Sequence, residues 1–309
     1  MAQPKYLTGD SAALNEFIDR FDVFLLDCDG VLWTGDHLFE GIVETLEMLR
    51  SRVLLGKKVV FVTNNSTKSR EDYQKKLTSM GIPSDVEEIF ASAYSSAIYI
   101  SRILKLPPGK NKVYVVGESG IEHELRTENI PFTGGTDPAL RRDITQEDYV
   151  KMADGSMLDP EVGVVLAGLD FHINYLKLSL GFQYLQRGAK FLATNLDSTL
   201  PNSHSFFPGA GSISIPLVNM SGQQPIALGK PSQAMMDAIE GKFQLDRART
   251  CMVGDRLNTD IKFGVEGGLG GTLAVLTGVN KKEDWEAADA PAVPAYYVDK
   301  LSDLRGAKS

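Results

Sequence analysis

Short, uninterrupted apolar runs recur along the chain and alternate with longer stretches in which apolar residues follow a helical spacing. Runs of this length without polar alternation predict strands that are buried on both faces of a parallel sheet, and the helical stretches predict the crossovers between them. We expect strands at 23–26, 59–62, 89–91, 112–116, 162–166, 190–193, 250–253 and 272–276, with an edge strand at 295–298. We expect helices at 69–80, 93–104, 120–128 and 175–187.

Two clusters of proline and glycine, at 106–109 and 208–211, interrupt this alternation. Such clusters mark hinges between domains, and the stretch between them has strands and helices of its own. We therefore expect an α/β protein with a doubly wound parallel sheet in a core domain, formed by 1–105 and 208–309, and an inserted α/β cap domain at 106–207. The alternative, one continuous doubly wound sheet, is less favoured.

Composition narrows the class of protein. A chain of 309 residues is long enough for two domains, and 43% hydrophobic with 23% charged residues is ordinary for a globular protein. The formal net charge of -8 argues against nucleic acid or an anionic membrane as a partner. Only two cysteines occur, which excludes a disulfide framework and suggests a reducing compartment. With no apolar leader and no run long enough to span a bilayer, we expect a cytosolic protein.

Charged residues follow the first predicted strand directly. Asp27 and Asp29 come after 23–26, and Gly30 then allows a sharp turn. Two carboxylates at the carboxyl end of a central strand lie where open α/β sheets bind their ligands. Such a concentration of charge is costly unless a cation or a reaction uses it. A polar turn that merely closes the strand is the alternative, since Asp and Gly are common in turns.

Three further polar groups stand at strand ends or helix starts. Taken singly, each allows a structural explanation as a turn, a helix cap or a surface charge. Taken together, they supply carboxylates for a hard cation such as Mg²⁺, a lysine, neutral donors for an anion, and an aspartate that can act as a nucleophile. The groups are Thr63, Asn64 and Asn65 after strand 59–62, Lys230 before a helix expected to hold Pro231 in its first turn, and Asp255 and Asp260 after strand 250–253.

These segments carry a family resemblance. They read DCDGVLW at 27–33, VTNNS at 62–66, GKPS at 229–232 and MVGDRLNTD at 252–260. In this order they resemble the haloacid dehalogenase superfamily, specifically its 4-nitrophenylphosphatase-like phosphatases, which include phosphoglycolate and pyridoxal phosphate phosphatases. The resemblance covers nearly the whole chain, from residue 21 to about residue 304. It implies an active enzyme with a capped core, because no core motif departs from the family pattern.

The resemblance also implies roles for the residues. Asp27 would be the nucleophile, and Asp29 the general acid that later acts as the general base. Thr63, Asn64 and Lys230 would hold the phosphoryl oxygens, and Asn65 would border the substrate. The carboxylates of Asp27 and Asp255, with the backbone carbonyl of Asp29, would bind Mg²⁺, and Asp260 would support that metal site.

The cap of this family selects the substrate. The pyridoxal phosphate branch carries a histidine immediately before a proline that matches Pro201, whereas this chain has Leu200 there. The departure favours the phosphoglycolate branch, although Leu200 would equally serve to pack the cap. The expected partner is a small phosphorylated metabolite, and because family members often dimerise through the cap, the resemblance makes a homodimer a candidate assembly.

The expected function is therefore Mg²⁺-dependent hydrolysis of small phosphate monoesters, such as phosphoglycolate-like acids and 4-nitrophenyl phosphate, through an aspartyl-phosphate. The alternative within the family is a pyridoxal phosphate phosphatase. A signalling receiver domain, which also phosphorylates an aspartate, belongs to a different class, and Asp29 and the large insertion argue against it. A scaffold that only binds phosphate is a third class, disfavoured by the complete set of acids.

Overall fold

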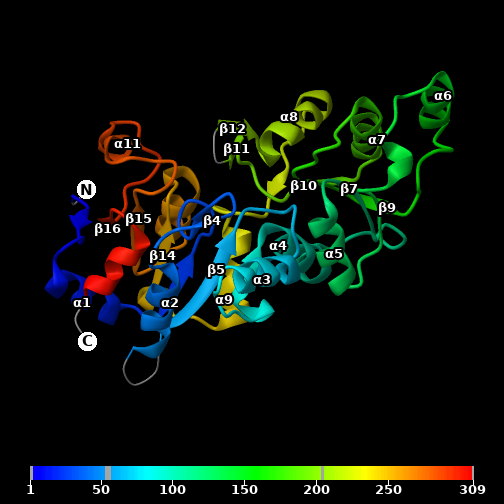
Figure 1. Cartoon of the computed structure of the whole chain (residues 1–309). Coiled ribbons are helices and arrows are strands. Elements are labelled where there is room, and N and C mark those ends of the chain that lie inside the picture. The colour runs from blue at the N-terminus through cyan, green and yellow to red at the C-terminus, as the bar shows by residue number, and fades with distance from the viewer. Residues whose placement is uncertain (1–2, 53–56, 203–204, 308–309) are drawn as a thin grey trace. The chain divides into compact units, whose positions relative to one another are not determined.

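The computed structural model describes residues 3–52, 57–202 and 205–307 (Figure 1). The chain divides into two compact units, and each has its own parallel sheet. The first unit comprises Met1–Thr63, Tyr73–Phe90 and Lys230–Ser309, and the second comprises Asn64–Asp72 and Ala91–Gly229. The α/β class predicted from the apolar runs is confirmed.

The sheet of the first unit has the strand order β1-β16-β15-β14-β2-β5-β6 over the described residues. Chain order reverses beside β2, with β5 on one side and β14 on the other, and such a switch point is where open α/β sheets bind ligands. The strands are β1 (Lys5–Tyr6), β2 (Val23–Leu26), β5 (Lys58–Thr63), β6 (Ile89–Ala91), β14 (Thr250–Gly254), β15 (Gly271–Val275) and β16 (Tyr296–Val298). A two-stranded hairpin, β3 (Trp33–Thr34) with β4 (His37–Leu38), follows β2.

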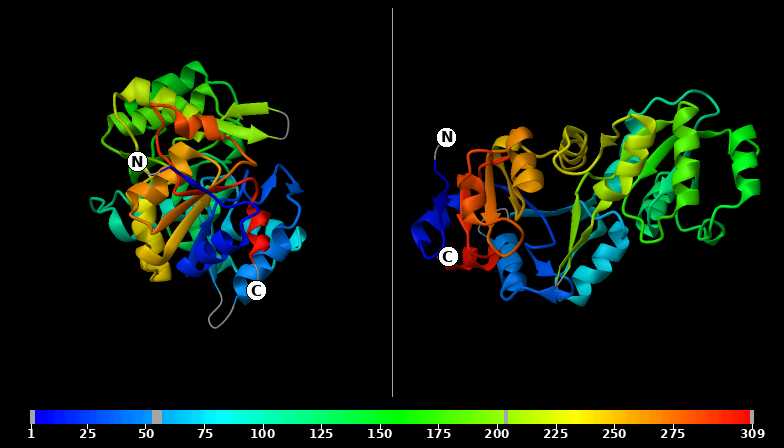
Figure 2. Two further views of the ribbon diagram at one scale, coloured as in Figure 1. Left: turned by 90° about the vertical axis from the view of Figure 1, so that its left-hand side faces the viewer. Right: turned by 90° about the horizontal axis from the view of Figure 1, so that it is seen from above.

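The edge of this sheet differs from the prediction. The strand at 295–298 was expected at the edge, but β16 lies between β15 and β1. The first and last strands of the chain are thus neighbours in the first unit (Figure 2). The two residues of β1 are both exposed and form no apolar run, so only their pairing with β16 makes them a strand.

Aromatic packing supports the core of the first unit. The first helix, α1, begins after Asp10, whose side chain accepts a hydrogen bond from the Ala13 N–H. Its buried face carries Phe17, whose ring lies 5.9 Å from that of Phe24 in β2. The helices of this unit include α1 (Ser11–Arg20), α2 (Ile42–Ser51), most of α3 (Arg70–Ser79), α9 (Gln233–Phe243), α10 (Lys262–Glu266) and α11 (Lys282–Glu286); its 3₁₀ and π turns are η1 (Val86–Glu88), η4 (Arg247–Arg249), η5 (Leu257–Ile261) and η6 (Leu301–Gly306).

The start of α9 corrects one detail of the sequence analysis. Pro231 was expected in the first turn of the helix, but the helix begins at Gln233. Ser232 is the N-cap, because its side chain accepts a hydrogen bond from the Met235 N–H. Lys230 therefore lies in the connection before the helix.

The sheet of the second unit has the strand order β13-β10-β9-β7-β8 in the described part of the chain. Its strands are β7 (Lys112–Val116), β8 (Phe132–Gly134), β9 (Val162–Ala167), β10 (Lys190–Ala193) and β13 (Ile226–Ala227), and β11 (Thr199–Asn202) pairs with β12 (Ser205–Pro208) in a separate hairpin. The helices are α4 (Ser92–Ile98), α5 (Ser119–Thr127), α6 (Gln146–Asp154), α7 (Tyr175–Gln186) and α8 (Ala210–Ser221), with η3 (Pro138–Leu140) as a 3₁₀ turn. The helix expected at 93–104 is α4 followed by a π-helical turn, η2 (Tyr99–Ile103).

The second unit extends beyond the predicted insertion at 106–207. It reaches Gly229 because β13 pairs with β10, with Ile226 opposite Leu192. The positions of the hinges, and with them the domain limits, stay a prediction.

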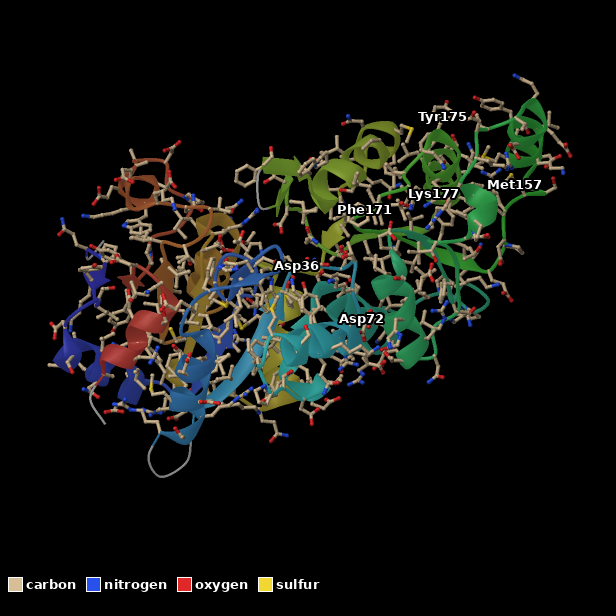
Figure 3. All side chains as sticks on the ribbon, in the orientation of Figure 1. Asp36, Asp72, Met157, Phe171, Tyr175 and Lys177 are labelled. Atoms are coloured by element: carbon tan, nitrogen blue, oxygen red, sulfur yellow. The ribbon has the colours of Figure 1, made fainter. Side chains whose placement is uncertain are left out.

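A buried ion pair holds the segment between β9 and α7 in the second unit. The ammonium of Lys177 lies 2.7 Å from Asp170 Oδ2, and both side chains are almost fully buried. The same segment leaves Phe171 and Tyr175 exposed (Figure 3). No helix among the described residues is both long and apolar enough to cross a membrane.

Candidate active site

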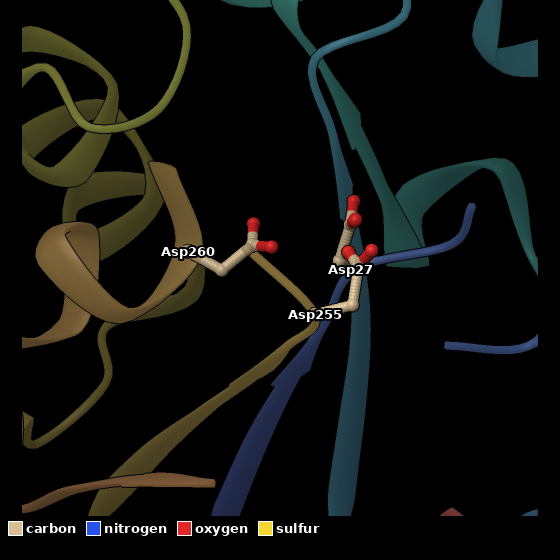
Figure 4. A group of neighbouring side chains, drawn as sticks. All are labelled: Asp27, Asp255 and Asp260. Atoms are coloured by element: carbon tan, nitrogen blue, oxygen red, sulfur yellow. The ribbon is translucent and has the colours of Figure 1, made fainter. Parts of the chain in front are cut away.

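Three buried aspartates from separate segments of the first unit form a cluster (Figure 4). Asp27 follows β2, Asp255 follows β14, and Asp260 lies in η5. Each offers one carboxylate oxygen within 4.8 Å of the others. The parallel pairing of β2 with β14 brings the first two together, and the Asp27 N–H continues it by donating to the Val253 carbonyl at 2.9 Å.

Lys230 is the cation of this cluster. Its Nζ lies 2.7 Å from Asp27 Oδ1 and 2.7 Å from Asp260 Oδ1, and it also donates to the Val62 carbonyl at 2.8 Å. The ammonium is buried, and the two carboxylates raise its pKa despite the opposing effect of burial. Lys230 is therefore charged, and a buried charge requires such paired and hydrogen-bonded surroundings.

The acids carry more negative charge than one lysine neutralises. Burial, followed by the nearby charge of Asp260, raises the pKa of Asp27 well above its usual range, while Lys230 opposes the rise. Burial and Asp260 also raise the pKa of Asp255, to about 7. Both shifts express the cost of placing carboxylates together away from water, a cost that a bound cation removes.

One oxygen of the cluster is suited to a cation. Asp255 Oδ2 accepts a hydrogen bond from the Val279 N–H at 2.7 Å. The other oxygen, Oδ1, is buried and has no hydrogen-bond partner among the residues that the structure describes. An unsatisfied buried carboxylate oxygen is costly, so a ligand is expected there. The set of carboxylate oxygens fits a hard divalent cation.

Two glycines allow the backbone to approach Asp255. A Cβ atom at Gly30 would lie 2.5 Å from Asp255 Oδ2, and one at Gly278 would lie 1.9 Å from the same oxygen. Gly30 also has φ +87°, which other residues rarely adopt. Both positions therefore require glycine. The sharp turn at Gly30 was predicted, but the close approach of both glycines to Asp255 was not, because it joins distant segments.

Asp29 and Thr63 are the two remaining predicted site residues that belong to the first unit. The Asp29 carboxylate accepts a hydrogen bond from the indole N–H of Trp33 at 2.8 Å, and its side chain does not belong to the cluster of Asp27, Asp255 and Asp260. Thr63 is the last residue of β5, the other neighbour of β2, and its hydroxyl lies 3.4 Å from that of Tyr73.

Asn64, Asn65 and Leu200 belong to the second unit. The side-chain amide of Asn64 donates to both carboxylate oxygens of Asp197, at 3.2 and 3.3 Å. Asn65 Oδ1 accepts hydrogen bonds from the N–H and the hydroxyl of Thr67, both at 2.8 Å. Leu200 lies half-buried in β11.

Three contributors to this geometry were not predicted from the sequence. Asp197 orients Asn64, the Trp33 indole orients Asp29, and Gly278 gives room to Asp255. Trp33 belongs to the motif DCDGVLW at 27–33, so its closeness to Asp29 in the sequence was a signal for this contact. Asp197 and Gly278 act through contacts distant in sequence, which no local pattern predicts.

Comparisons with known proteins agree with the family resemblance of the motifs. A family model described as haloacid dehalogenase-like hydrolase matches residues 24–131, and a second, HAD-hydrolase-like model matches residues 227–304. A 4-nitrophenylphosphatase of Schizosaccharomyces pombe is 53% identical over 290 residues, covering 94% of this chain and 95% of the relative. The chloroplastic phosphoglycolate phosphatase 1A of Arabidopsis thaliana is 41% identical over 300 residues, covering 96% of this chain and 79% of the relative.

One of the similar solved structures contains a bound metal. The glycerol phosphate phosphatase of Mycobacterium tuberculosis, in complex with magnesium, superposes with a TM-score of 0.75 at 26% identity, covering 93% of this chain and 77% of that one. That neighbour is consistent with a divalent metal at the acidic cluster here. The family resemblance and the enzyme class predicted from the motifs are confirmed. The chain belongs to the haloacid dehalogenase-like hydrolases and is a phosphoric monoester hydrolase.

Proposed function

We propose that this enzyme hydrolyses small phosphate monoesters in a Mg²⁺-dependent reaction through an aspartyl-phosphate on Asp27, with phosphoglycolate-like acids as preferred substrates. The observation that carries the proposal is the buried group of Asp27, Lys230, Asp255 and Asp260, in which Asp255 Oδ1 lacks a partner among the described residues. A group so rich in acid suits a reaction that requires both a carboxylate nucleophile and a bound cation.

In the first step a carboxylate oxygen of Asp27 attacks phosphorus. The new P–O bond forms as the bond from phosphorus to the ester oxygen breaks, and the leaving oxygen takes the electron pair together with a proton from Asp29. Lys230 serves this step in two ways: it holds Asp27 at Oδ1 and opposes the rise in the pKa of that carboxyl. With Thr63 and Asn64, it would then contact the phosphoryl oxygens as charge develops on them.

In the second step water attacks the same phosphorus atom. Asp29, now a carboxylate, takes a proton from the water while the P–O bond to Asp27 breaks. Inorganic phosphate leaves, Asp27 regains its carboxylate, and Asp29 regains the proton that it gave up. The two aspartates are thus unchanged over one cycle, and water is the only co-reactant.

The residues for the metal are present. Asp27, Asp255 and the backbone carbonyl of Asp29 would hold Mg²⁺, with Asp260 in support. When bound, Mg²⁺ neutralises phosphate charge and orients the phosphoryl group for in-line attack. Lys230 already pairs with Asp260, which favours a supporting role for this acid over direct ligation.

Leu200 supports the choice of substrate. A leucine offers no hydrogen bond to a pyridine ring, so the site would leave polar groups of pyridoxal 5′-phosphate without partners. The names of the relatives point the same way, since they include phosphoglycolate phosphatase and 4-nitrophenylphosphatase. A pyridoxal phosphate phosphatase is therefore the weaker alternative.

Both cysteines are buried and unpaired, which fits a reducing compartment such as the cytosol.

The proposal is tested with the purified 309-residue chain and a panel of phosphate esters, each assayed with Mg²⁺ and with a chelator. We expect metal-dependent release of phosphate, with the highest kcat/KM for phosphoglycolate among the natural esters tested, including glycerol phosphate and pyridoxal 5′-phosphate. Hydrolysis that is equally fast in excess chelator would contradict the metal dependence. Pyridoxal 5′-phosphate as the best substrate would overturn the substrate assignment alone.

A further inference from the structure

Trp33 contacts Asp29, the candidate general acid, and the proposed reaction assigns no role to this tryptophan. It is fully buried at the start of the β3–β4 hairpin, and its indole N–H donates to Asp29 Oδ1 at 2.8 Å. The backbone repeats the connection, because the Gly30 N–H donates to the Trp33 carbonyl at 2.7 Å. The hairpin and Asp29 are thus joined through both side chain and main chain.

Two residues of α3, Tyr73 and Lys76, contact the indole ring. The ring of Tyr73 stacks on it with a centroid distance of 6.4 Å and an interplanar angle of 30°. Lys76 Nζ lies 4.4 Å from the centroid of the indole ring. Lys76 also donates to the Gly35 carbonyl at 2.9 Å, which ties the turn of the hairpin to the same helix. A ring held in this way presents its N–H in one direction.

We propose that Trp33 is a positioning residue for Asp29, which fixes the carboxyl oxygen that exchanges protons with the ester and with water. The inference rests on the proposed role of Asp29 as acid and base. An indole N–H only donates, so its partner Oδ1 accepts, and in a protonated carboxyl group the carbonyl oxygen is the better acceptor. The exchanged proton is therefore carried by Oδ2.

The consequence is a carboxyl group that is oriented before substrate binds. Without the indole N–H, the Asp29 carboxyl would lose this restraint, and a fraction of the molecules would present the other oxygen to the ester or to water. General acid and base catalysis depends on placing the proton within hydrogen-bond reach of the reacting atom. General acid–base catalysis contributes roughly 10²–10⁴-fold, so a partial loss of this orientation should lower the rates by about 10-fold.

The test uses Trp33→Phe, which removes the N–H and keeps an aromatic ring beside Tyr73 and Lys76. The chain offers a matched control, because it has only one other tryptophan. Trp285 is also buried, but its Nε1 has no hydrogen-bond partner in the described part of the chain, and it packs in a separate cluster with Leu257 and Ala274. Trp285→Phe therefore makes the same chemical change without removing a hydrogen bond.

Single-turnover kinetics measure the two steps separately. In Trp33→Phe we expect phosphoenzyme formation to fall about 10-fold for an alkyl phosphate and much less for 4-nitrophenyl phosphate, which has a good leaving group. Dephosphorylation should fall about 10-fold whichever ester formed the intermediate, while KM changes less than 3-fold. Trp285→Phe should behave as the wild type. Equal slowing of phosphoenzyme formation for both esters would overturn the proposal.

A double-substitution cycle distinguishes positioning from general disturbance. In an Asp29→Asn background, Trp33→Phe should change the rates by less than about 2-fold, because its effect acts through the Asp29 carboxyl. A further 10-fold loss in that background would refute the inference. A wild-type chain that forms no phosphoenzyme would instead refute the proposed function.

Nuclear magnetic resonance keeps the inference testable if Trp33→Phe does not fold. Protein labelled with ¹⁵N at tryptophan gives two indole signals, which Trp285→Phe assigns. We expect the Trp33 N–H proton to resonate downfield of that of Trp285 and to move upfield in Asp29→Ala. A Trp33 signal that Asp29→Ala leaves in place would overturn the inference whatever the kinetics.

Discussion

The ammonium of Lys230 lies 2.7 Å from Asp27 Oδ1 in the buried interior of the first unit. The same ammonium lies 2.7 Å from Asp260 Oδ1, so one lysine serves two carboxylates of an acidic cluster that also contains Asp255. The negative charge that remains has two consequences: it makes the metal-free protein sensitive to pH, and it gives a cation a place to bind.

Metal-free protein should lose stability as the pH rises. The folded pKa of Asp255, about 7, lies above the ordinary value of 3.8, so the folded state binds more protons than the unfolded state between these values. Stability therefore falls as the pH rises from about 4 to about 7. In excess chelator, the free energy of unfolding in urea should be greater at pH 5 than at pH 7.5. The matched variant Asp255→Asn should show a shallower fall, and an unchanged slope would contradict this origin of the effect.

Removal of metal should abolish activity, and Mg²⁺ should restore it. Ca²⁺ should restore far less, because it accepts more ligands at longer distances and would engage both oxygens of Asp27, including the attacking one. Dialysis against EDTA followed by titration with each ion measures this. Equal recovery with Ca²⁺ would contradict the assignment of Asp27 as both metal ligand and nucleophile.

Asp29→Asn should slow phosphoenzyme formation most for esters with poor leaving groups. General acid catalysis contributes roughly 10²–10⁴-fold, and 4-nitrophenolate departs without much help. Rapid-quench measurement of the first step with an alkyl ester and with 4-nitrophenyl phosphate makes the comparison. If both esters lose the same factor before dephosphorylation, Asp29 is not the acid.

Leu200→His should shift the preference towards pyridoxal 5′-phosphate. The imidazole supplies a hydrogen-bond partner for a pyridine ring, and a site that pairs a polar group of the ligand discriminates more strongly than an apolar one. The ratio of kcat/KM for pyridoxal 5′-phosphate to that for phosphoglycolate is the quantity to measure. Leu200→Met, which stays apolar, is the control, and a ratio that neither substitution changes would mean that Leu200 only packs its hairpin.

Much of the architecture was predictable because buried parallel strands leave a strong local signal. The apolar run at 59–62 is the interior of β5, and the run at 190–193 coincides with β10. The grouping of the acids that follow the strands was also predictable, since parallel strands bring their carboxyl ends to one edge of the sheet. β1 was not predictable, because Lys5–Tyr6 becomes a strand only through pairing with the far end of the chain.

The geometry of the candidate site was only partly predictable, for the same reason. Asp27 and Asp255 were recognisable from their place after apolar runs. The unpartnered Oδ1 of Asp255 and the close approach of Gly278 arise from contacts between segments far apart in sequence. The Trp33–Asp29 hydrogen bond is local, but residue types alone do not show whether a tryptophan packs or donates.

The most direct measurement is acid quenching of a single turnover with ³²P-labelled substrate, followed by counting of the label on the protein. Wild-type enzyme should form labelled protein transiently, and Asp29→Asn should retain the label longer because the base that activates water is lost. Asp27→Asn should carry no label and hydrolyse no ester, while unfolding as cooperatively as the wild type. Labelled protein or normal hydrolysis in Asp27→Asn would contradict the account.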